Sequence, residues 1–324
     1  MSNKPIIIVA GEPNSIFVEI FIKSIQQKKF KTPLILVMSL NVLRLQMKFL
    51  NYKYPINIII EKNILNTKLS NRKINIIDVN FESEVAFQKI SGRSRNYIDE
   101  CFSLALKLIK KGVSNKLING PVSKKFFLGK KYQGVTEYLA KKTNTKNFAM
   151  LIYNKNLAVS PLTTHLPIKL VAKTITKKLI VNKITLLNNF YENFLNKKPM
   201  VAITGINPHC ESVSNFNEDI KIVEPATNCL KKNINISGPF AADTIFIKKN
   251  RIKYDLIVGM YHDQVLAPLK TLYEYDAINI TVGLPFQRVS PDHGPNEDML
   301  GKNLSNNHSL IACIKFLENL NDKS

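Results

Sequence analysis

The chain has 324 residues, of which 45% are hydrophobic and 22% are charged, an ordinary composition for a globular protein with room for two α/β domains. No apolar run approaches the roughly 18 residues that a membrane span requires. The short apolar run 6–10 stops at Glu12 and Pro13, as a first strand does and a signal peptide does not. We therefore expect a cytoplasmic protein with no membrane partner.

The formal net charge of +22 comes almost entirely from lysines that are spread over the whole chain. A nucleic-acid surface more often has clustered arginines with aromatic residues between them, and only six arginines are present. The sequence thus predicts no nucleic-acid partner, and a basic binding protein without catalysis is the alternative from another class. The four cysteines are far apart and form no CxxC motif, which argues against a disulfide framework and a zinc ribbon.

Short apolar runs rich in β-branched residues predict buried strands in the first half of the chain, over 6–10, 34–38, 56–60 and 74–79. Helical periodicity is clearest over 97–111, and Gly112 follows it as a stop signal. A further short strand over 116–118 leads into the turn 119–124, which places a hydroxyl and an ammonium group just beyond the strand. A plain surface turn is the alternative for this segment.

The alternation of strands and helices continues through the second half of the chain. Pro167 opens a predicted helix that runs to residue 180, because proline is favoured in a first helical turn. Further helices are predicted over 217–232 and 305–320, and 285–295 is predicted to be a loop. The predicted strands are 148–153, 157–162, 199–204, 256–258 and 278–282.

Alternating strands and helices predict an α/β protein with a largely parallel sheet. No internal repeat or low-complexity linker marks a domain boundary. We expect a first α/β lobe from residues 1–125 together with 300–324. The second lobe, 126–299, is expected to carry most of the candidate metal and substrate residues.

Three of the five histidines, His165, His209 and His262, each follow a predicted strand in a short polar turn. The carboxyl ends of parallel strands meet at one edge of a sheet, where the ligands of open α/β folds bind. Three neutral imidazoles suit a divalent ion such as Zn²⁺, Co²⁺ or Ni²⁺ and leave coordination positions open for a substrate. Their spacing matches no local metal motif, so a structural role for each histidine is the alternative.

Lys270, Asn279 and Arg288 form a second candidate group, spread over neighbouring strand and loop segments. An arginine and a lysine with an amide between them suit a phosphate or a carboxylate. Ordinary surface charge is the alternative, more so for Lys270 than for one of only six arginines. The chain lacks the patterns GxGxxG, GxxxxGK[ST] and GxSxG, which argues against a Rossmann dinucleotide site, a P-loop kinase and an α/β-hydrolase.

Seven motifs, in this order, resemble the 4-hydroxythreonine-4-phosphate dehydrogenases of pyridoxal phosphate biosynthesis. The resemblance covers most of the chain and is densest from residue 119 to residue 294. The motifs are NGPVSK (119–124), GVTEYLA (134–140), TTHLP (163–167), NPHCE (207–211), GPFAADT (238–244), YDLIVGMYHDQVLAPLK (254–270) and INITVGLPFQRVSPDHG (278–294).

The resemblance implies a fold similar to that of the isocitrate and isopropylmalate dehydrogenases, with two α/β/α lobes and the active site in the cleft between them, and not a Rossmann fold. It implies a homodimer whose subunits share each active site, and one divalent metal ion (zinc, magnesium or cobalt) bound by His165, His209 and His262. The positions that contact the phosphorylated amino-acid substrate in the family match Thr136, Lys270, Asn279 and Arg288.

The resemblance also implies NAD or NADP as the cofactor, bound without a Rossmann fingerprint. The implied reaction oxidises the secondary alcohol of 4-phosphohydroxy-L-threonine, with the metal as a Lewis acid, and the resulting 3-oxo acid loses CO₂ to give 3-amino-2-oxopropyl phosphate. The candidate catalytic groups are Asp263, Asp243 and Lys270. The loop 290–302 keeps these residues of the pattern that surrounds the cofactor's adenosine in such relatives: His293, Gly294, Asp298, Gly301 and Lys302.

Three departures from the family pattern bear on substrate choice. Val135 stands where relatives usually have histidine, so one substrate contact is missing. The segment 11–19 reads GEPNSIFVE in place of a sequence close to GDPAGIGPE, and Ser15 and Phe17 resist the backbone angles that glycine allows, which predicts a changed loop. Residues 295–297 replace small residues of the cofactor loop. A same-family dehydrogenase with a different or non-phosphorylated hydroxy acid is therefore the first alternative.

Overall fold

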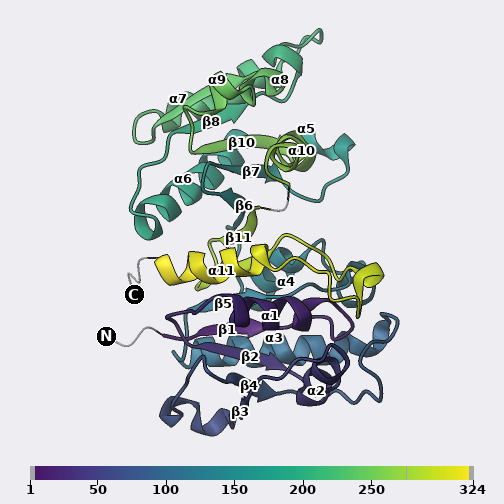
Figure 1. The fold of residues 1–324 in the computed structure, drawn as a ribbon. Coiled ribbons are helices and arrows are strands. Elements are labelled where there is room, and N and C mark those ends of the chain that lie inside the picture. The colour runs from purple at the N-terminus through teal and green to yellow at the C-terminus, as the bar shows by residue number, and fades with distance from the viewer. Residues whose placement is uncertain (1–3, 275, 321–324) are drawn as a thin grey trace. The chain divides into compact units, whose positions relative to one another are not determined.

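The computed structural model describes residues 4–274 and 276–320. The chain folds as two compact units, the first from the residues up to Tyr138 together with Pro285–Asn319, and the second from Leu139–Leu284. Each unit is an α/β structure with a sheet of its own strands and helices packed around it (Figure 1). No helix within the described residues is both long enough and apolar enough to cross a membrane.

The first unit has a parallel sheet with the strand order β3-β4-β2-β1-β5-β12. Strands β1, β2 and β5 are buried along their whole length, and β4 is buried up to its last residue, as expected for strands that helices cover on both faces. The strands are β1 (Ile6–Val9), β2 (Leu34–Met38), β3 (Ile56–Ile58), β4 (Ile74–Asp78), β5 (Lys116–Asn119) and β12 (Gln287–Pro291).

Four helices pack around this sheet: α1 (Phe17–Gln27), α2 (Leu40–Phe49), α3 (Arg95–Lys110) and α11 (His308–Asn319). Helix α1 contacts α2 and α11, and Figure 1 shows α11 in yellow beside α1 in purple, whereas α3 packs against β1 and β2. The short turns of the unit are η1 (Glu61–Asn66), η2 (Gly92–Ser94), η3 (Lys124–Leu128) and η6 (Glu297–Met299). Helix α4 (Val135–Lys142) begins in this unit, and the division between the units falls within it.

The second unit has the strand order β11-β6-β7-β10-β8-β9. Strand β6 runs antiparallel to β11 and β7, and the other pairs are parallel. The strands are β6 (Ala149–Asn154), β7 (Leu157–Thr163), β8 (Val201–Thr204), β9 (Ile236–Phe240), β10 (Leu256–Tyr261) and β11 (Ile278–Val282). The helices and turns are α5 (Ile168–Thr174), α6 (Lys177–Phe194), η4 (Pro208–Cys210), η5 (Asp219–Val223), α7 (Glu224–Leu230), α8 (Ala242–Ile245), α9 (Lys248–Arg251) and α10 (His262–Tyr273).

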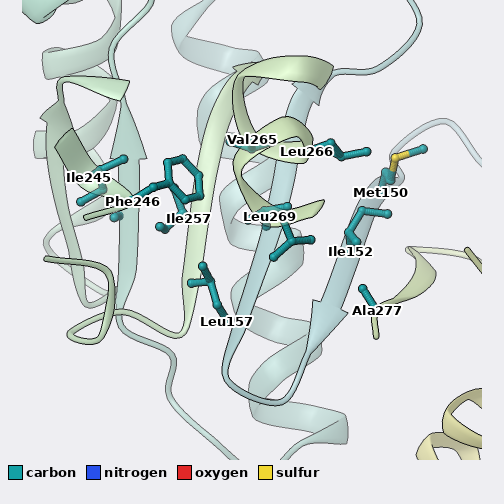
Figure 2. Packing of buried hydrophobic residues seen from close by; sticks show 12 residues of the cluster. Met150, Ile152, Leu157, Ile245, Phe246, Ile257, Val265, Leu266, Leu269 and Ala277 are labelled. Carbon is teal, nitrogen blue, oxygen red and sulfur yellow. The ribbon is translucent and has the colours of Figure 1, made fainter. Parts of the chain in front are cut away.

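Helix α10 is fixed to the second sheet by a cluster of buried apolar side chains (Figure 2). Val265, Leu266 and Leu269 form the buried stripe of the helix and pack on Leu157 and Ile257 from β7 and β10. Burial of each such side chain stabilises the fold by roughly 1.5–3 kcal/mol. Because α10 begins at His262, directly after the end of β10, this packing also fixes the backbone of that histidine.

The expectation of a largely parallel α/β protein is confirmed, with β6 as the antiparallel exception. Three details of the predicted elements are wrong. The helix expected from Pro167 to residue 180 is broken at Ile175 and Thr176, where the hydroxyl of Thr176 caps the new helix α6. The expected loop over 285–295 contains the strand β12, and β10 continues through Gly259 to Tyr261.

The unit boundaries lie elsewhere than the predicted ones at residues 125 and 299. Residues 285–291 belong to the first unit because β12 pairs in parallel with β5. Residues 126–138 belong to it because the ring of Tyr138 packs on Phe102 of α3, with 5.3 Å between the ring centroids.

Candidate functional site

Three adjacent parallel strands of the second unit, β7, β10 and β8, each lead into one of the candidate histidines. His165 lies just beyond the end of β7, His262 follows the last residue of β10, and His209 lies in the short turn η4 after β8. All three histidines therefore follow the carboxyl ends of neighbouring strands, as the sequence predicts.

The structure brings His165 and His262 together, with 5.7 Å between their ring centroids. The strands below them are tied by a hydrogen bond of 2.7 Å from the Thr163 hydroxyl to the Met260 carbonyl oxygen. Asp263 Oδ1 lies 2.7 Å from Nδ1 of His262. An ionised carboxylate only accepts, so this contact places a proton on Nδ1 and leaves the Nε2 lone pair for another partner.

His209 lies on a loop that Asp219 organises from the start of η5. The carboxylate of Asp219 is fully buried and accepts hydrogen bonds from the backbone N–H groups of Ile206 (2.7 Å) and Asn207 (3.0 Å). His209 and Cys210 both have left-handed backbone angles, with φ of 55° and 62°. Such angles are uncommon outside glycine and mark a locally strained turn that the surrounding contacts hold in place.

Gln264 connects the β8 and β10 ends of this site. Its side-chain oxygen accepts from the Thr204 hydroxyl (2.9 Å) and the Met260 N–H (2.7 Å), and its amide donates to the Gly205 carbonyl oxygen (2.8 Å). The side chain thus links the strand that precedes His209 to the strand that precedes His262. The sequence places Gln264 in the same polar cluster, but it gives no signal for these contacts with a distant loop.

The donor set fits a divalent metal in its chemistry, since three imidazoles and a carboxylate that orients one ring are typical of such sites. His165 and His262 are placed for a shared ligand, whereas His209 is exposed on its loop. Within residues 4–274 and 276–320, no group of three or more His, Cys, Asp or Glu side chains is close enough to hold an ion. The metal triad therefore stays a prediction, with two of its members side by side.

The remaining candidates of the second unit lie on three different elements. Asp243 is exposed in the first turn of α8, and Lys270 is half-buried about 12 Å along α10 from His262, at 1.5 Å per residue. Asn279 is half-buried on β11, and its side-chain Oδ1 is buried without a hydrogen-bond donor among the described residues. Buried acceptors are nearly always paired, so Asn279 is a residue that a bound ligand would complete.

A candidate anion site in the first unit lies around Arg288 on β12. Its side chain is only 2% exposed, and its Nε donates to Asn119 Oδ1 at 2.8 Å, at the end of the neighbouring strand β5. Its Nη1 lies 3.5 Å from the hydroxyl of Thr136, the second residue of α4. Burial lowers the pKa of Arg288 to about 10, so the guanidinium stays charged at neutral pH. A buried cation beside an amide and a hydroxyl suits an anionic group.

The candidate cofactor residues lie in the segment between β12 and α11. His293 is half-buried with its Nδ1 3.0 Å from the Gly294 carbonyl oxygen, and burial lowers the pKa of its imidazole, which is therefore neutral at neutral pH. Asp298 and Lys302 are exposed, the first of them in η6. The loop touches the start of α1, because the Ile16 N–H donates to the Pro295 carbonyl oxygen at 3.3 Å.

The altered segment 11–19 forms a tightly bonded turn at the end of β1. Glu12 is buried and accepts from the Ser94 hydroxyl (2.8 Å) and the Asn14 N–H (3.2 Å), and burial raises the pKa of its carboxyl above the usual value. Ser15 and Phe17 are not among the residues with positive φ, so the turn needs no glycine at either position. Gly11 does need its glycine, since it has a φ of 82° and a Cβ there would lie 2.2 Å from the Pro121 carbonyl oxygen.

The model of the pyridoxal phosphate biosynthetic protein PdxA family matches residues 23–317. The chain belongs to the PdxA family. This bears out the resemblance drawn from the sequence motifs.

Two curated relatives carry different names. A 4-hydroxythreonine-4-phosphate dehydrogenase from Sulfurihydrogenibium is 39% identical over 249 residues, or 75% of each chain. A D-threonate 4-phosphate dehydrogenase from Salmonella typhimurium is 30% identical over 324 residues, or 98% of each chain. Family membership and these names support a PdxA-type dehydrogenase role for the chain.

The solved structures of relatives confirm the fold class. A 4-hydroxythreonine-4-phosphate dehydrogenase from Klebsiella pneumoniae aligns with a TM-score of 0.83 and 29% identity, over 98% of this chain and 99% of that one. The isocitrate dehydrogenase from Methylococcus capsulatus aligns with a TM-score of 0.51 at 10% identity, over 97% of this chain and 85% of that one. The α/β architecture expected from the sequence, similar to that of isocitrate dehydrogenase, is therefore correct.

Proposed function

We propose that the chain oxidises 4-phosphohydroxy-L-threonine with NAD or NADP to 2-amino-3-oxo-4-phosphooxybutanoate, which then loses CO₂ to give 3-amino-2-oxopropyl phosphate. This reaction belongs to the formation of pyridoxine 5'-phosphate, and we place it in the cytoplasm. The observation that carries the proposal is the family match over residues 23–317, with Arg288 buried as a cation for a phosphorylated substrate.

Four side chains are assigned to the substrate, Thr136, Lys270, Asn279 and Arg288, and Arg288 is assigned to its phosphate group. In the first unit, the Arg288 guanidinium supplies charge and donors, and Asn119 and Thr136 fix its orientation through their side-chain oxygens. Lys270 and Asn279 of the second unit are the other proposed substrate residues, and the buried Oδ1 of Asn279 would accept from a donor of the substrate, such as its amino group. A planar guanidinium with several donors binds a phosphate in a defined orientation, whereas an ammonium acts as a point charge.

The metal ligands in this proposal are His165, His209 and His262, for one divalent ion such as zinc, magnesium or cobalt. When bound, the ion supplies Lewis acidity that makes the substrate hydroxyl easier to deprotonate. Asp263 acts through His262, because its carboxylate holds Nδ1 of that ring at 2.7 Å. Asp243, exposed at the start of α8, is then the candidate for removing the proton from the hydroxyl, and Lys270 is a further candidate catalytic group.

The dinucleotide is assigned to the loop that carries His293, Gly294, Asp298 and Lys302, and when bound there it would supply a hydride acceptor for the substrate carbon that bears the hydroxyl. The neutral imidazole of His293 suits a hydrogen bond to an uncharged part of the nucleotide. The oxidised carbon then lies one position from the carboxylate-bearing carbon, so the product is a β-keto acid. Such acids lose CO₂ readily because the electrons of the broken bond pass into the neighbouring carbonyl.

A homodimer whose subunits share the active site is also part of the proposal. The segment that follows His209 exposes three large apolar side chains, Val213, Phe216 and Ile220, and Ile168 is exposed beyond His165. Exposed large apolar groups on the segments that carry candidate site residues suit a surface that another chain covers. We assign the second copy of this chain to that surface, with no nucleic acid and no membrane as partners.

D-threonate 4-phosphate is the second candidate substrate. The curated relative that covers 98% of the chain carries that name, and Val135 removes a contact that family members usually make with histidine. The two candidates share the phosphate, the secondary alcohol and the carboxylate. At the carbon beside the carboxylate, 4-phosphohydroxy-L-threonine carries an amino group and D-threonate 4-phosphate carries a hydroxyl group. The same oxidation and loss of CO₂ would give a three-carbon ketone phosphate with a hydroxyl group instead of an amino group.

The experiment compares kcat/KM for three compounds: 4-phosphohydroxy-L-threonine, D-threonate 4-phosphate and unphosphorylated 4-hydroxy-L-threonine. The proposal predicts the highest value for the first and a loss of at least about tenfold without the phosphate, since a charged hydrogen bond contributes about 1.5–3 kcal/mol. A higher kcat/KM for D-threonate 4-phosphate would identify that compound, the second candidate, as the preferred substrate. Equal values with and without the phosphate would contradict the assignment of Arg288.

A further inference from the structure

One face of helix α1 touches both ends of the candidate cofactor loop. Ile16, Glu19 and Lys23 are spaced three and four residues apart, so they lie on the same side of the helix. Ile16, the residue just before the helix, bonds through its N–H to the Pro295 carbonyl oxygen near the start of the loop. Glu19 and Lys23 bond to the end of the loop, at Asn303 and Ser305.

Glu19 and Lys23 form a compact clamp on the loop backbone. Oε1 of Glu19 accepts from the Ser305 N–H at 2.6 Å and from Lys23 Nζ at 2.8 Å, and the Glu19 side chain is only 1% exposed. Lys23 Nζ also donates to the carbonyl oxygens of Asn303 (2.9 Å) and Ser305 (3.1 Å). The pair therefore satisfies one backbone donor and two backbone acceptors of the loop.

A further hydrogen bond and a close approach to an aromatic ring restrict the same end of the loop. The Tyr52 hydroxyl donates to Asn303 Oδ1 at 2.5 Å, and Asn303 has a left-handed φ of 57°. Gly301 has a φ of 71°, and a Cβ there would lie 2.8 Å from the Phe49 ring. The end of the loop is thus fixed in a backbone conformation that is uncommon outside glycine and asparagine.

We propose that Glu19 and Lys23 are positioning residues that hold residues 295–305 in the conformation that binds the dinucleotide. The inference rests on the proposed function, since that assigns His293, Asp298 and Lys302 to the cofactor. The loop has a single short turn, η6, as regular structure, so its own backbone bonds do little to order it. A loop that is ordered before binding spares the ligand the entropic cost of ordering it, which appears as higher affinity.

The test compares four variants with the wild type by calorimetric titration of NAD and NADP, by steady-state kinetics and by hydrogen exchange of residues 295–305. Lys23→Met removes the clamp, Lys23→Arg retains the charge and the donors, and Tyr52→Phe removes one hydroxyl without leaving a buried charge. Lys31→Met changes an exposed lysine outside the loop contacts and serves as the matched control.

Lys23→Met is expected to raise the Kd and KM of the dinucleotide about tenfold, to leave kcat and the substrate KM nearly unchanged, and to speed exchange in the loop. Lys23→Arg restores the affinity, Tyr52→Phe raises the Kd by about threefold, and the control behaves as wild type. If Lys23→Met does not fold because Glu19 is left buried and charged, the Tyr52→Phe result and the double variant Glu19→Gln/Lys23→Met decide the matter.

Unchanged dinucleotide affinity in Lys23→Met and Tyr52→Phe, with normal loop exchange, overturns the inference. A uniform loss of stability and kcat with unchanged KM also overturns it, since that shows a merely structural pair. A wild type that binds neither NAD nor NADP is a different result, because it defeats the proposed function. In that case, faster loop exchange in Lys23→Met still supports the clamp, and unchanged exchange overturns it.

Discussion

Among the candidate residues, Arg288 gives the most direct support for the proposal of an anionic substrate. A guanidinium that is 2% exposed is costly to bury, and it is retained here beside the side-chain oxygens of Asn119 and Thr136. We propose that this buried charge is kept for the phosphate of the substrate. The sequence singles out Arg288 as one of six arginines, but its burial follows from the pairing of β12 with β5, which the sequence pattern does not predict.

Arg288→Lys should therefore lower kcat/KM for the phosphorylated substrate by about 10- to 100-fold, because an ammonium cannot keep the Asn119 contact and bind the phosphate as a fork. The effect should be much smaller for the unphosphorylated compound. Arg72→Lys, at an exposed position, is the matched control. A loss that is the same for both compounds would show that Arg288 supports the fold and not the phosphate.

The buried carboxyl of Glu12 should make the free energy of unfolding depend on pH, and a glutamine at this position should not. Burial raises the pKa of its carboxyl in the folded protein above the unfolded value near 4.5, so the folded state favours the protonated form. The resulting stabilisation is present below the unfolded pKa and is lost as the pH rises through the folded pKa, by about 1.4 kcal/mol for each unit of the shift.

Glu12→Gln lacks this titration. Its free energy of unfolding should therefore rise relative to that of the wild type as the pH increases from 4 to 7. Urea unfolding of both proteins at each pH measures the difference, and the other carboxylates cancel in the comparison. The same pH dependence in both proteins would mean that Glu12 is hydrated in the folded state.

At the scale of elements, the strands that carry the histidines were predictable because apolar β-branched runs end in polar turns. The side chains that organise those turns were not. Asp219 and Gln264 bond to backbone groups of segments that are distant in sequence, and such contacts leave no periodic pattern. Strand β12 has few apolar residues and ends in proline, and the break before α6 depends on a single capping threonine, so both escaped prediction.

Gly259 sets how closely α10 approaches β10. A Cβ at this position would lie 2.4 Å from Cγ1 of Val265 and 2.9 Å from Oε1 of Gln264. Gly259→Ala should push the start of α10 away from the strand, costing about 1–3 kcal/mol of stability and displacing His262 and Gln264 together. Urea unfolding and metal retention measure the two effects, with Gly92→Ala, which meets no atom within 4 Å, as the control. Wild-type stability with normal metal retention would contradict this packing account.

At the scale of the whole molecule, the fold class and the family followed from the sequence, and the unit boundaries did not. The motifs are continuous segments that can be recognised in the sequence itself. The boundaries instead depend on whether residues 126–138 and 285–299 pack in the first or the second unit. The pairing of β12 with β5 and the packing of the Tyr138 ring on Phe102 place parts of these segments in the first unit.

The proposed homodimer places a second copy on the apolar surface beyond His209. Val213→Lys/Phe216→Lys puts two charges on that surface and should convert the dimer to a monomer in light scattering, with loss of turnover. Leu65→Lys, at an exposed position of the first unit, should leave the dimer intact. A double variant that remains an active dimer would place the interface elsewhere.

The most direct test of the central claim, a metal-dependent PdxA-type dehydrogenase, is reduction of NAD or NADP with 4-phosphohydroxy-L-threonine before and after chelation, with zinc, magnesium or cobalt then added back. The account predicts turnover that chelation abolishes and a divalent ion restores, and no restoration in His209→Ala. Turnover that survives complete removal of metal, or that returns in His209→Ala with wild-type metal content, would contradict it.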